Sequence, residues 1–177
     1  NEGTTIFAHW KSDTTPTLLM ESVFVLECLA PAKLNADRFL PPTPIRVVTN
    51  HRGKPEFGED GKFIKLPSTL KNAPAHLIPD FAEIKKLIQP MAQANESLAS
   101  KQASVLKQFA TDIMLEKLSS EIQRLESLAK VNATIRSEEL SLLKKEQMNL
   151  KNSLDQARVR LDSIRLIWRG SMERLTS

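Results

Sequence analysis

The stretch MAQANESLASKQASVLKQFATDIMLEKLSSEIQRLESLAK, residues 91–130, decides the fold of this chain. It opens a run from Met91 to Arg169 without glycine or proline, and all ten prolines lie at or before Pro90. Proline in a helix interior costs about 3 kcal/mol and glycine about 1 kcal/mol. Such a run, rich in Leu, Lys, Glu, Gln, Ser and Ala, predicts helix. A single rod would be about 120 Å long and would expose its apolar stripe, so we expect it to fold back or to pair.

The first predicted helix covers residues 91–130, and its spacing slips by about one residue near Glu116 and Lys117. Residues 132–136 contain a β-branched cluster that disfavours helix, so we expect the chain to reverse there. The predicted apolar stripe of this helix consists of Leu98, Val105, Phe109, Ile113, Leu118, Ile122, Leu125 and Ala129.

The second predicted helix begins at Ser137 as N-cap, with Glu138 and Glu139 near the positive end of its dipole. Apolar residues then recur at steps of three and four, as in a heptad seam. That seam comprises Leu140, Leu143, Gln147, Leu150, Leu154, Ala157, Leu161, Ile164 and Trp168. An antiparallel, coiled-coil-like hairpin with the first helix would cover it, and so would a parallel homodimer. We favour the hairpin because the first helix also needs a cover.

The first half of the chain predicts strands. Residues 17–30 (TLLMESVFVLECLA) alternate in hydrophobicity, and residues 45–49 (IRVVT) follow three prolines that set an extended entry. Residues 50–53 (NHRG) predict a reversing turn, with residues 63–66 (FIKL) as hairpin partner. Residues 67–79 predict a linker, and Asp80 an N-cap for a short helix, residues 81–89, which Pro90 kinks or ends.

Together these segments predict an α+β fold: a small, mainly antiparallel sheet in residues 1–79, then a long helical hairpin in residues 80–177. The polar start lacks an initiator Met, so we expect one domain excised from a larger protein.

Composition limits the class of protein. Hydrophobic residues make up 41% and charged residues 26%, as in folded, soluble proteins. The net charge of +4 comes from 25 basic and 21 acidic residues, a mixture less one-sided than nucleic-acid domains usually show. A single cysteine, Cys28, excludes an internal disulfide and suits a reducing cytosol. No apolar run is long enough for a membrane span, and no signal peptide is present.

Signatures of catalysis are missing. Gly61 and Lys62 lack the earlier glycine and the following hydroxyl of a phosphate-binding loop. The histidines are far apart in sequence, and Cys28 lies in an apolar segment, so zinc-ligand spacing is not met. We therefore expect no catalytic residue, no cofactor and no metal site, and we predict that this chain is not an enzyme.

The most suggestive surface lies near the C-terminal end. On a helix, spacings of seven and four would place three arginines on one side, next to a tryptophan. Arg and Trp are enriched at interface hot spots, so this face could bind an acidic protein or a phosphate backbone. Alternatively, Asp155 pairs with Lys151, Asp162 pairs with the arginines, and Trp168 is a core residue. The candidate partner-binding residues are Arg158, Arg160, Arg165, Trp168 and Arg169.

Several blocks of the sequence resemble one known family. Residues 38–46 (RFLPPTPIR), 121–128 (EIQRLESL) and 135–140 (IRSEEL) are similar to segments of the bacterial RNA polymerase-associated RapA family. A fourth match is SLDQA at 153–157, continuing as RLDSIRLI at 160–167. The four blocks keep the family's order and correspond to its C-terminal end.

This resemblance implies an accessory piece of a Swi/Snf-type, helicase-like ATPase that binds core RNA polymerase and recycles it in transcription. The family's ATPase motifs lie upstream, so ATP, Mg²⁺ and DNA binding are expected only of the full-length protein. Partners implied are RNA polymerase and the protein's own ATPase domains, in the bacterial cytoplasm and associated with the nucleoid through polymerase. A direct nucleic-acid binder and a homo-oligomerising coiled coil remain alternatives.

Overall fold

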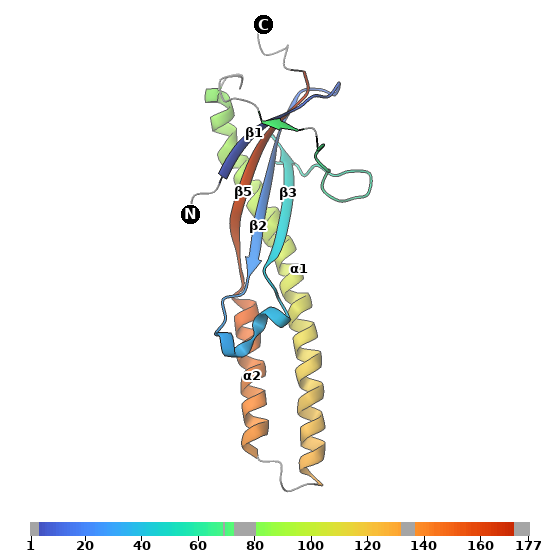
Figure 1. Cartoon of the computed structure of the whole chain (residues 1–177), viewed down its shortest axis with the longest axis vertical. Helices are drawn as coiled ribbons and strands as arrows, with labels where there is room; N and C mark the ends of the chain where they lie inside the picture. Colours follow the sequence, from blue (N-terminus) through green and yellow to red (C-terminus); the bar gives the residue numbers. More distant parts are fainter. Residues whose placement is uncertain (1–3, 69, 73–80, 132–136, 172–177) are drawn as a thin grey trace. The chain divides into compact units, whose positions relative to one another are not determined.

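The computed structural model describes residues 4–68, 70–72, 81–131 and 137–171 (Figure 1). It confirms the α+β class. In chain order the elements are β1 (Thr4–Trp10), β2 (Thr17–Glu27), the 3-10 helices η1 (Ala32–Leu34) and η2 (Ala36–Arg38), β3 (Thr43–Asn50), β4 (Lys71–Asn72), α1 (Phe81–Ala129), α2 (Ser137–Asp155) and β5 (Arg158–Arg169).

The chain forms two compact units. Unit 1 comprises residues 1–25, 44–101 and 160–177, and unit 2 comprises residues 26–43 and 102–159. Both units draw on the first and the second half of the sequence. The predicted division of one domain into residues 1–79 and 80–177 stays a prediction.

The five strands form one mixed sheet in the order β3-β2-β5-β1-β4 (Figure 1). β1 pairs in parallel with β5, from Thr4 opposite Ser163 to Trp10 opposite Arg169. On its other side β1 pairs antiparallel with β4. The parallel pair joins segments from opposite ends of the sequence, so the sheet extends beyond the predicted residues 1–79.

The last part of the predicted second helix is a β-strand in the structure. α2 ends at Asp155 and residues 158–169 are β5, so the expected helical course to Trp168 is wrong. Leu166 packs on one face of the sheet and Ile167 on the other, as a strand's alternation requires. The spacing of apolar residues did not distinguish a helix from a strand here, because pairing with the distant β1 determines that residues 158–169 form a strand.

The two strands predicted from alternation are confirmed, with one correction at the prolines. β3 begins at Thr43 and includes Pro44, whereas we expected regular structure only from Ile45. β3 is an edge strand, where a residue without an N–H is tolerated. The predicted turn is also present: Gly53 donates its N–H to the carbonyl of Asn50 at 2.8 Å and has φ of +70°, which favours glycine.

The predicted hairpin partner, residues 63–66, is not a strand. Only isolated bridges form in this region, between Thr49 and Pro55 and between Phe57 and Phe63, whose rings lie 5.0 Å apart. Phe63, Ile64, Leu66 and Leu70 instead pack against the buried face made by Ala8, Leu19, Val48 and Ile167. The predicted cap at Asp80 and the reversal at residues 132–136 lie outside the described residues.

α1 continues through Pro90, so a short helix that ends there is wrong, whereas a kink at Pro90 stays a prediction. Ile84, before the proline, and Met91, after it, are both buried in the same core cluster. Pro90 itself is exposed, on the side where water can satisfy the carbonyl that the ring frees. Packing on both sides of the proline therefore keeps the helix continuous.

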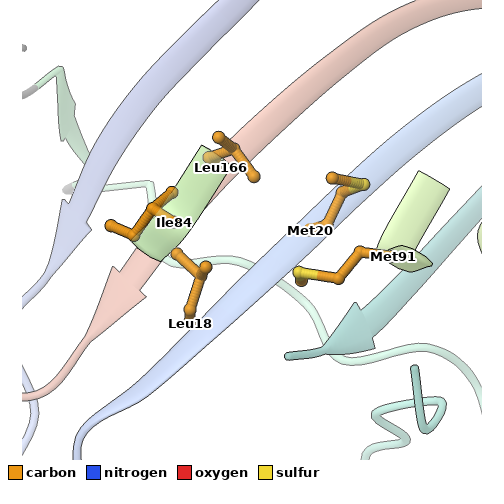
Figure 2. Packing of buried hydrophobic residues seen from close by; sticks show 5 residues of the cluster. All are labelled: Leu18, Met20, Ile84, Met91 and Leu166. Atoms are coloured by element: carbon orange, nitrogen blue, oxygen red, sulfur yellow. The ribbon is translucent and has the colours of Figure 1, made fainter. Parts of the chain in front are cut away.

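Unit 1 packs the start of α1 on one face of the sheet. Figure 2 shows Leu18 and Met20 of β2 and Leu166 of β5 meeting Ile84 and Met91 of α1. One buried polar residue, Asn95, completes this contact by hydrogen bonding to two strands.

The Asn95 side chain is fully buried, and its oxygen accepts a hydrogen bond from the Thr49 hydroxyl at 2.7 Å. Its NH₂ group donates to the Ser22 hydroxyl at 2.7 Å and to the Met20 carbonyl at 3.3 Å. Ser22 and Thr49 are themselves buried. These bonds specify how α1 is placed on β2 and β3, because each buried polar group needs a partner.

The buried side of α1 differs from the predicted stripe. Val105, Phe109 and Ile113 are exposed, whereas small residues and methionines point inward. The small alanine side chains let the backbone of α1 come close to the elements it packs against. Alanines are therefore buried although Val, Phe and Ile are more hydrophobic. Of the predicted stripe, Leu118 and Ile122 are buried as expected. Among residues 84–129 of α1, the buried ones are Ile84, Met91, Asn95, Ala99, Ala103, Ala110, Thr111, Met114, Leu118 and Ile122.

In unit 2, α2 lies beside the C-terminal part of α1 (Figure 1). The Gln147 amide donates to the Ser119 hydroxyl at 2.9 Å, and Lys144 pairs with Glu126 at 2.7 Å. Leu150 and Leu154 of the predicted seam are fully buried. α2 begins at Ser137, where the helix was predicted to start, with Glu138 and Glu139 in its first turn; the N-cap role of Ser137 stays a prediction.

The end of α2 is held by a cation from α1. The Lys107 ammonium donates to the carbonyls of Asp155 and Ala157. A positive charge at the negative end of the helix dipole is favourable, and it satisfies carbonyls that have no partner inside the helix.

We predict that Asn95→Ala lowers the free energy of unfolding by about 2–3 kcal/mol, because two buried hydroxyls and a carbonyl lose their partner. Urea unfolding of both variants tests this, with Gln93→Ala, an exposed position of the same helix, as control. A difference between the two variants below about 0.5 kcal/mol would contradict the anchoring role.

Lys107→Met keeps the aliphatic stem but removes the ammonium. We expect a loss of about 1 kcal/mol, with faster amide hydrogen exchange in the last turn of α2. Lys117→Met, on an exposed position of α1, is the control. Equal exchange in the two variants would show that Lys107 does not hold this helix end.

Candidate partner-binding surface

The five candidate residues lie on β5, so the helical face assumed for them does not exist. Successive side chains of a strand point to opposite faces. In unit 1, Trp168 therefore lies on the face that α1 covers, whereas Arg165 and Arg169 lie on the other. The structure splits the predicted set instead of gathering it.

Arg165 belongs to an ionic group centred on Glu21. Glu21 pairs with Arg46 at 2.6 Å and with Arg165 at 3.7 Å, so it bridges β3, β2 and β5. Arg46 also donates to the Ile64 carbonyl at 2.8 Å. The Glu21 side chain is only 12% exposed, so screening by water is limited. This group links three neighbouring strands.

Arg169 connects the sheet to the loop that follows β3. Its guanidinium lies 3.4 Å from Glu56 and 5.6 Å from the ring centroid of Trp10. Glu56 in turn accepts a hydrogen bond from the Asn50 amide at 2.8 Å. Most of the Arg169 side chain is buried, with Nε left without a hydrogen-bond partner. Its position is that of a structural residue.

Trp168 packs against the cluster of Leu18, Met20, Ile84, Met91 and Leu166. Its indole N–H donates to the Ser171 carbonyl at 3.4 Å, a long bond. The interpretation of Trp168 as a core residue is therefore the one the packing favours, although in a sheet and not in a helical seam.

The remaining two arginines are more exposed. In unit 2, Arg158 lies 3.5 Å from Glu27, and in unit 1, Arg160 lies 3.9 Å from Asp162. The predicted helical pairing of Lys151 with Asp155 is present at 3.2 Å. Asp162 pairs with Arg160 because residues two apart on a strand lie on the same face. The pairing predicted from helical spacing was with arginines farther along the sequence.

Sequence reasoning missed an exposed apolar stripe on α1. Val105, Phe109 and Ile113 are 69%, 64% and 40% exposed. Their spacing of four residues places them on one side of the helix. Alanines and methionines at helical spacing form a second stripe on α1, and that stripe is the buried one. The sequence analysis chose Val, Phe and Ile instead because they are more hydrophobic.

A groove of about 870 Å³ runs between α1 and α2 in unit 2. It is lined by Ser119, Ile122, Gln123 and Glu126 of α1 and by Lys144 and Met148 of α2, among others. Met148 is 61% exposed, so an apolar side chain is available in the groove.

Little in the described part of the chain suggests catalysis. Within it, no three His, Cys, Asp or Glu side chains come together as metal ligands would. Burial raises the pKa of the Cys28 thiol, and Asp37 raises it further, so the nucleophilic thiolate is disfavoured. The thiol donates to the Ser153 carbonyl at 3.2 Å. Among the described residues, no helix is both long and apolar enough to cross a bilayer.

These features define an α+β protein with an exposed apolar stripe and a groove on its helices. Residues 1–169 match the model of the family described as RNA polymerase recycling family C-terminal. The chain belongs to that family, which confirms the resemblance found in its four sequence blocks. Transcription and an RNA polymerase partner follow from the family.

We predict that Glu21→Gln lowers the free energy of unfolding by about 1–2 kcal/mol, because two arginines lose their carboxylate in a partly buried setting. Thermal or urea unfolding measures this. Glu121→Gln removes an exposed pair with Arg124 and should leave the free energy of unfolding nearly unchanged. Equal effects would mean that the Glu21 group does not stabilise the sheet.

Proposed function

We propose that this chain is the accessory C-terminal module of an ATP-dependent, Swi/Snf-type protein that recycles RNA polymerase in the bacterial cytoplasm. The family match over residues 1–169 carries the proposal. The module itself is non-enzymatic and binds no cofactor; ATP and Mg²⁺ belong to the ATPase domains of the full-length protein. It acts through contacts with core polymerase and through packing on those ATPase domains.

The helices supply the stiff part of this module. We propose that the C-terminal part of α1 and α2 form an antiparallel, coiled-coil-like hairpin. Three cross-helix contacts support it: Lys107 with the end of α2, Ser119 with Gln147, and Glu126 with Lys144. Positions that are later on α1 meet positions that are earlier on α2.

Direct binding of nucleic acid through β5 is the second candidate function. The arginines of β5 have carboxylates nearby, at 3.4 Å for Arg169, 3.5 Å for Arg158 and 3.7 Å for Arg165. Such pairing reduces the positive potential available to phosphates. A homo-oligomerising coiled coil is also less favoured, because Leu150 and Leu154 are already buried within the chain.

The test of the proposed function is polymerase binding by the full-length protein with and without residues 1–177. We expect removal of the module to weaken binding to purified core polymerase at least tenfold, or to reduce multiple-round transcription by a similar factor. Unchanged binding and unchanged recycling would refute an accessory role in either.

Salt dependence tests the nucleic-acid alternative. Phosphate contacts release counterions, so affinity then falls steeply with added salt. We expect weak RNA and DNA binding that is not reduced further by Arg158→Gln together with Arg160→Gln, the more exposed arginines. Tight binding that is lost in this double variant would favour the alternative.

A further inference from the structure

The exposed stripe of α1 is an unusual surface for a folded protein. Single exposed apolar side chains are common, but here Val105, Phe109 and Ile113 follow one another on one side of a helix. They extend over about 12 Å of the helix axis. Exposed apolar residues that are contiguous mark sites of interaction.

The stripe continues toward the groove on the same helix. Residues seven apart on an α-helix lie on nearly the same side. Gln123, which lines the groove, is fourteen residues after Phe109, and Ser119 is fourteen after Val105. From Val105 to Glu126 the combined surface is about 32 Å long, with the exposed Met148 providing an apolar contact at its far end.

The charges beside the stripe are of both signs. Asp112 and Glu116 lie one turn after Phe109 and Ile113 on the exposed side of α1, and the exposed Lys101 and Lys117 lie one turn before Val105 and one turn after Ile113. Asp112 accepts a hydrogen bond from Gln108 at 2.8 Å. Nucleic acid binds where basic side chains are concentrated, which is not the case here, whereas a protein partner can match charges of both signs.

A second copy of the chain is also a poor occupant. Two stripes related by a two-fold axis at Phe109 would meet over only about two helical turns and would leave the groove outside the contact. Three partly exposed side chains per copy fall well short of the roughly 800 Å² per partner of a stable interface. A partner that covers both stripe and groove uses the whole length.

We propose that the stripe and the groove together are the docking site for core RNA polymerase. The matching element on polymerase is an amphipathic helix or segment with apolar side chains at helical spacing and basic groups that face Asp112 and Glu116. This inference rests on the proposed function, because the family supplies polymerase as the partner.

The first experiment compares Phe109→Ser with Leu142→Ser in the full-length protein, measuring affinity for purified core polymerase. Leu142 is 66% exposed, like Phe109, but lies on α2 and outside the groove lining, so it is a matched control. We expect at least a tenfold loss for Phe109→Ser and less than a twofold change for Leu142→Ser. Both variants should unfold at the same urea concentration as the unmodified protein.

Equal affinity of the Phe109→Ser variant and the unmodified protein would overturn the docking site, while leaving the accessory function intact. If removing residues 1–177 changes neither binding nor recycling, the proposed function fails and this inference fails with it. The two failures are therefore distinguishable.

A photo-crosslinking amino acid in place of Phe109 identifies the occupant directly. In a mixture of full-length protein and core polymerase, we expect crosslinks to a polymerase subunit. Crosslinks only to nucleic acid, to a second copy or to the same polypeptide would each overturn the inference. A site placed at Leu142 should give little crosslinking to polymerase.

Discussion

The hydrogen bonds of Asn95 are the constraint on which unit 1 depends. Apolar contacts between α1 and the sheet would tolerate several rotations of the helix, because Leu and Met side chains adapt to their neighbours. Asn95 allows one, in which its amide meets Thr49, Ser22 and the Met20 carbonyl. Met91 and Ala99, four residues away on either side, then face the sheet. A polar residue thus determines how an apolar interface is assembled.

Ion pairs fix the positions of charged side chains on the sheet in a similar way. Glu21 and Glu56 hold Arg46, Arg165 and Arg169 on one face, between neighbouring strands and a loop. These charges stabilise the module and are largely occupied within it. Val105, Phe109 and Ile113 of α1, in contrast, stay exposed in the described part of the chain. This apolar surface is therefore better suited to docking than the paired arginines.

Local patterns predicted the elements whose stability is local. Alternation was enough for β2 and β3, and the acidic first turn marked the start of α2. The sequence did not reveal β5, because pairing with the distant β1 decides its structure, nor the continuity of α1 at Pro90, which depends on packing at Ile84 and Met91. The predicted helical face of arginines is wrong because these residues lie on β5, a strand, where alternate side chains point to opposite faces. The exposed stripe was missed because Ala and Met, not the larger residues, occupy the buried side.

The place of β5 in the sheet has a consequence for how the chain acquires its structure during synthesis. β5 lies between β2 and β1, although it is the last strand along the sequence. While the ribosome is still translating the helices, β2 can pair with β3 and β1 with β4, but one edge of β1 and one edge of β2 stay open to other chains. The sheet is completed only when β5, the last of its strands along the sequence, has been synthesised.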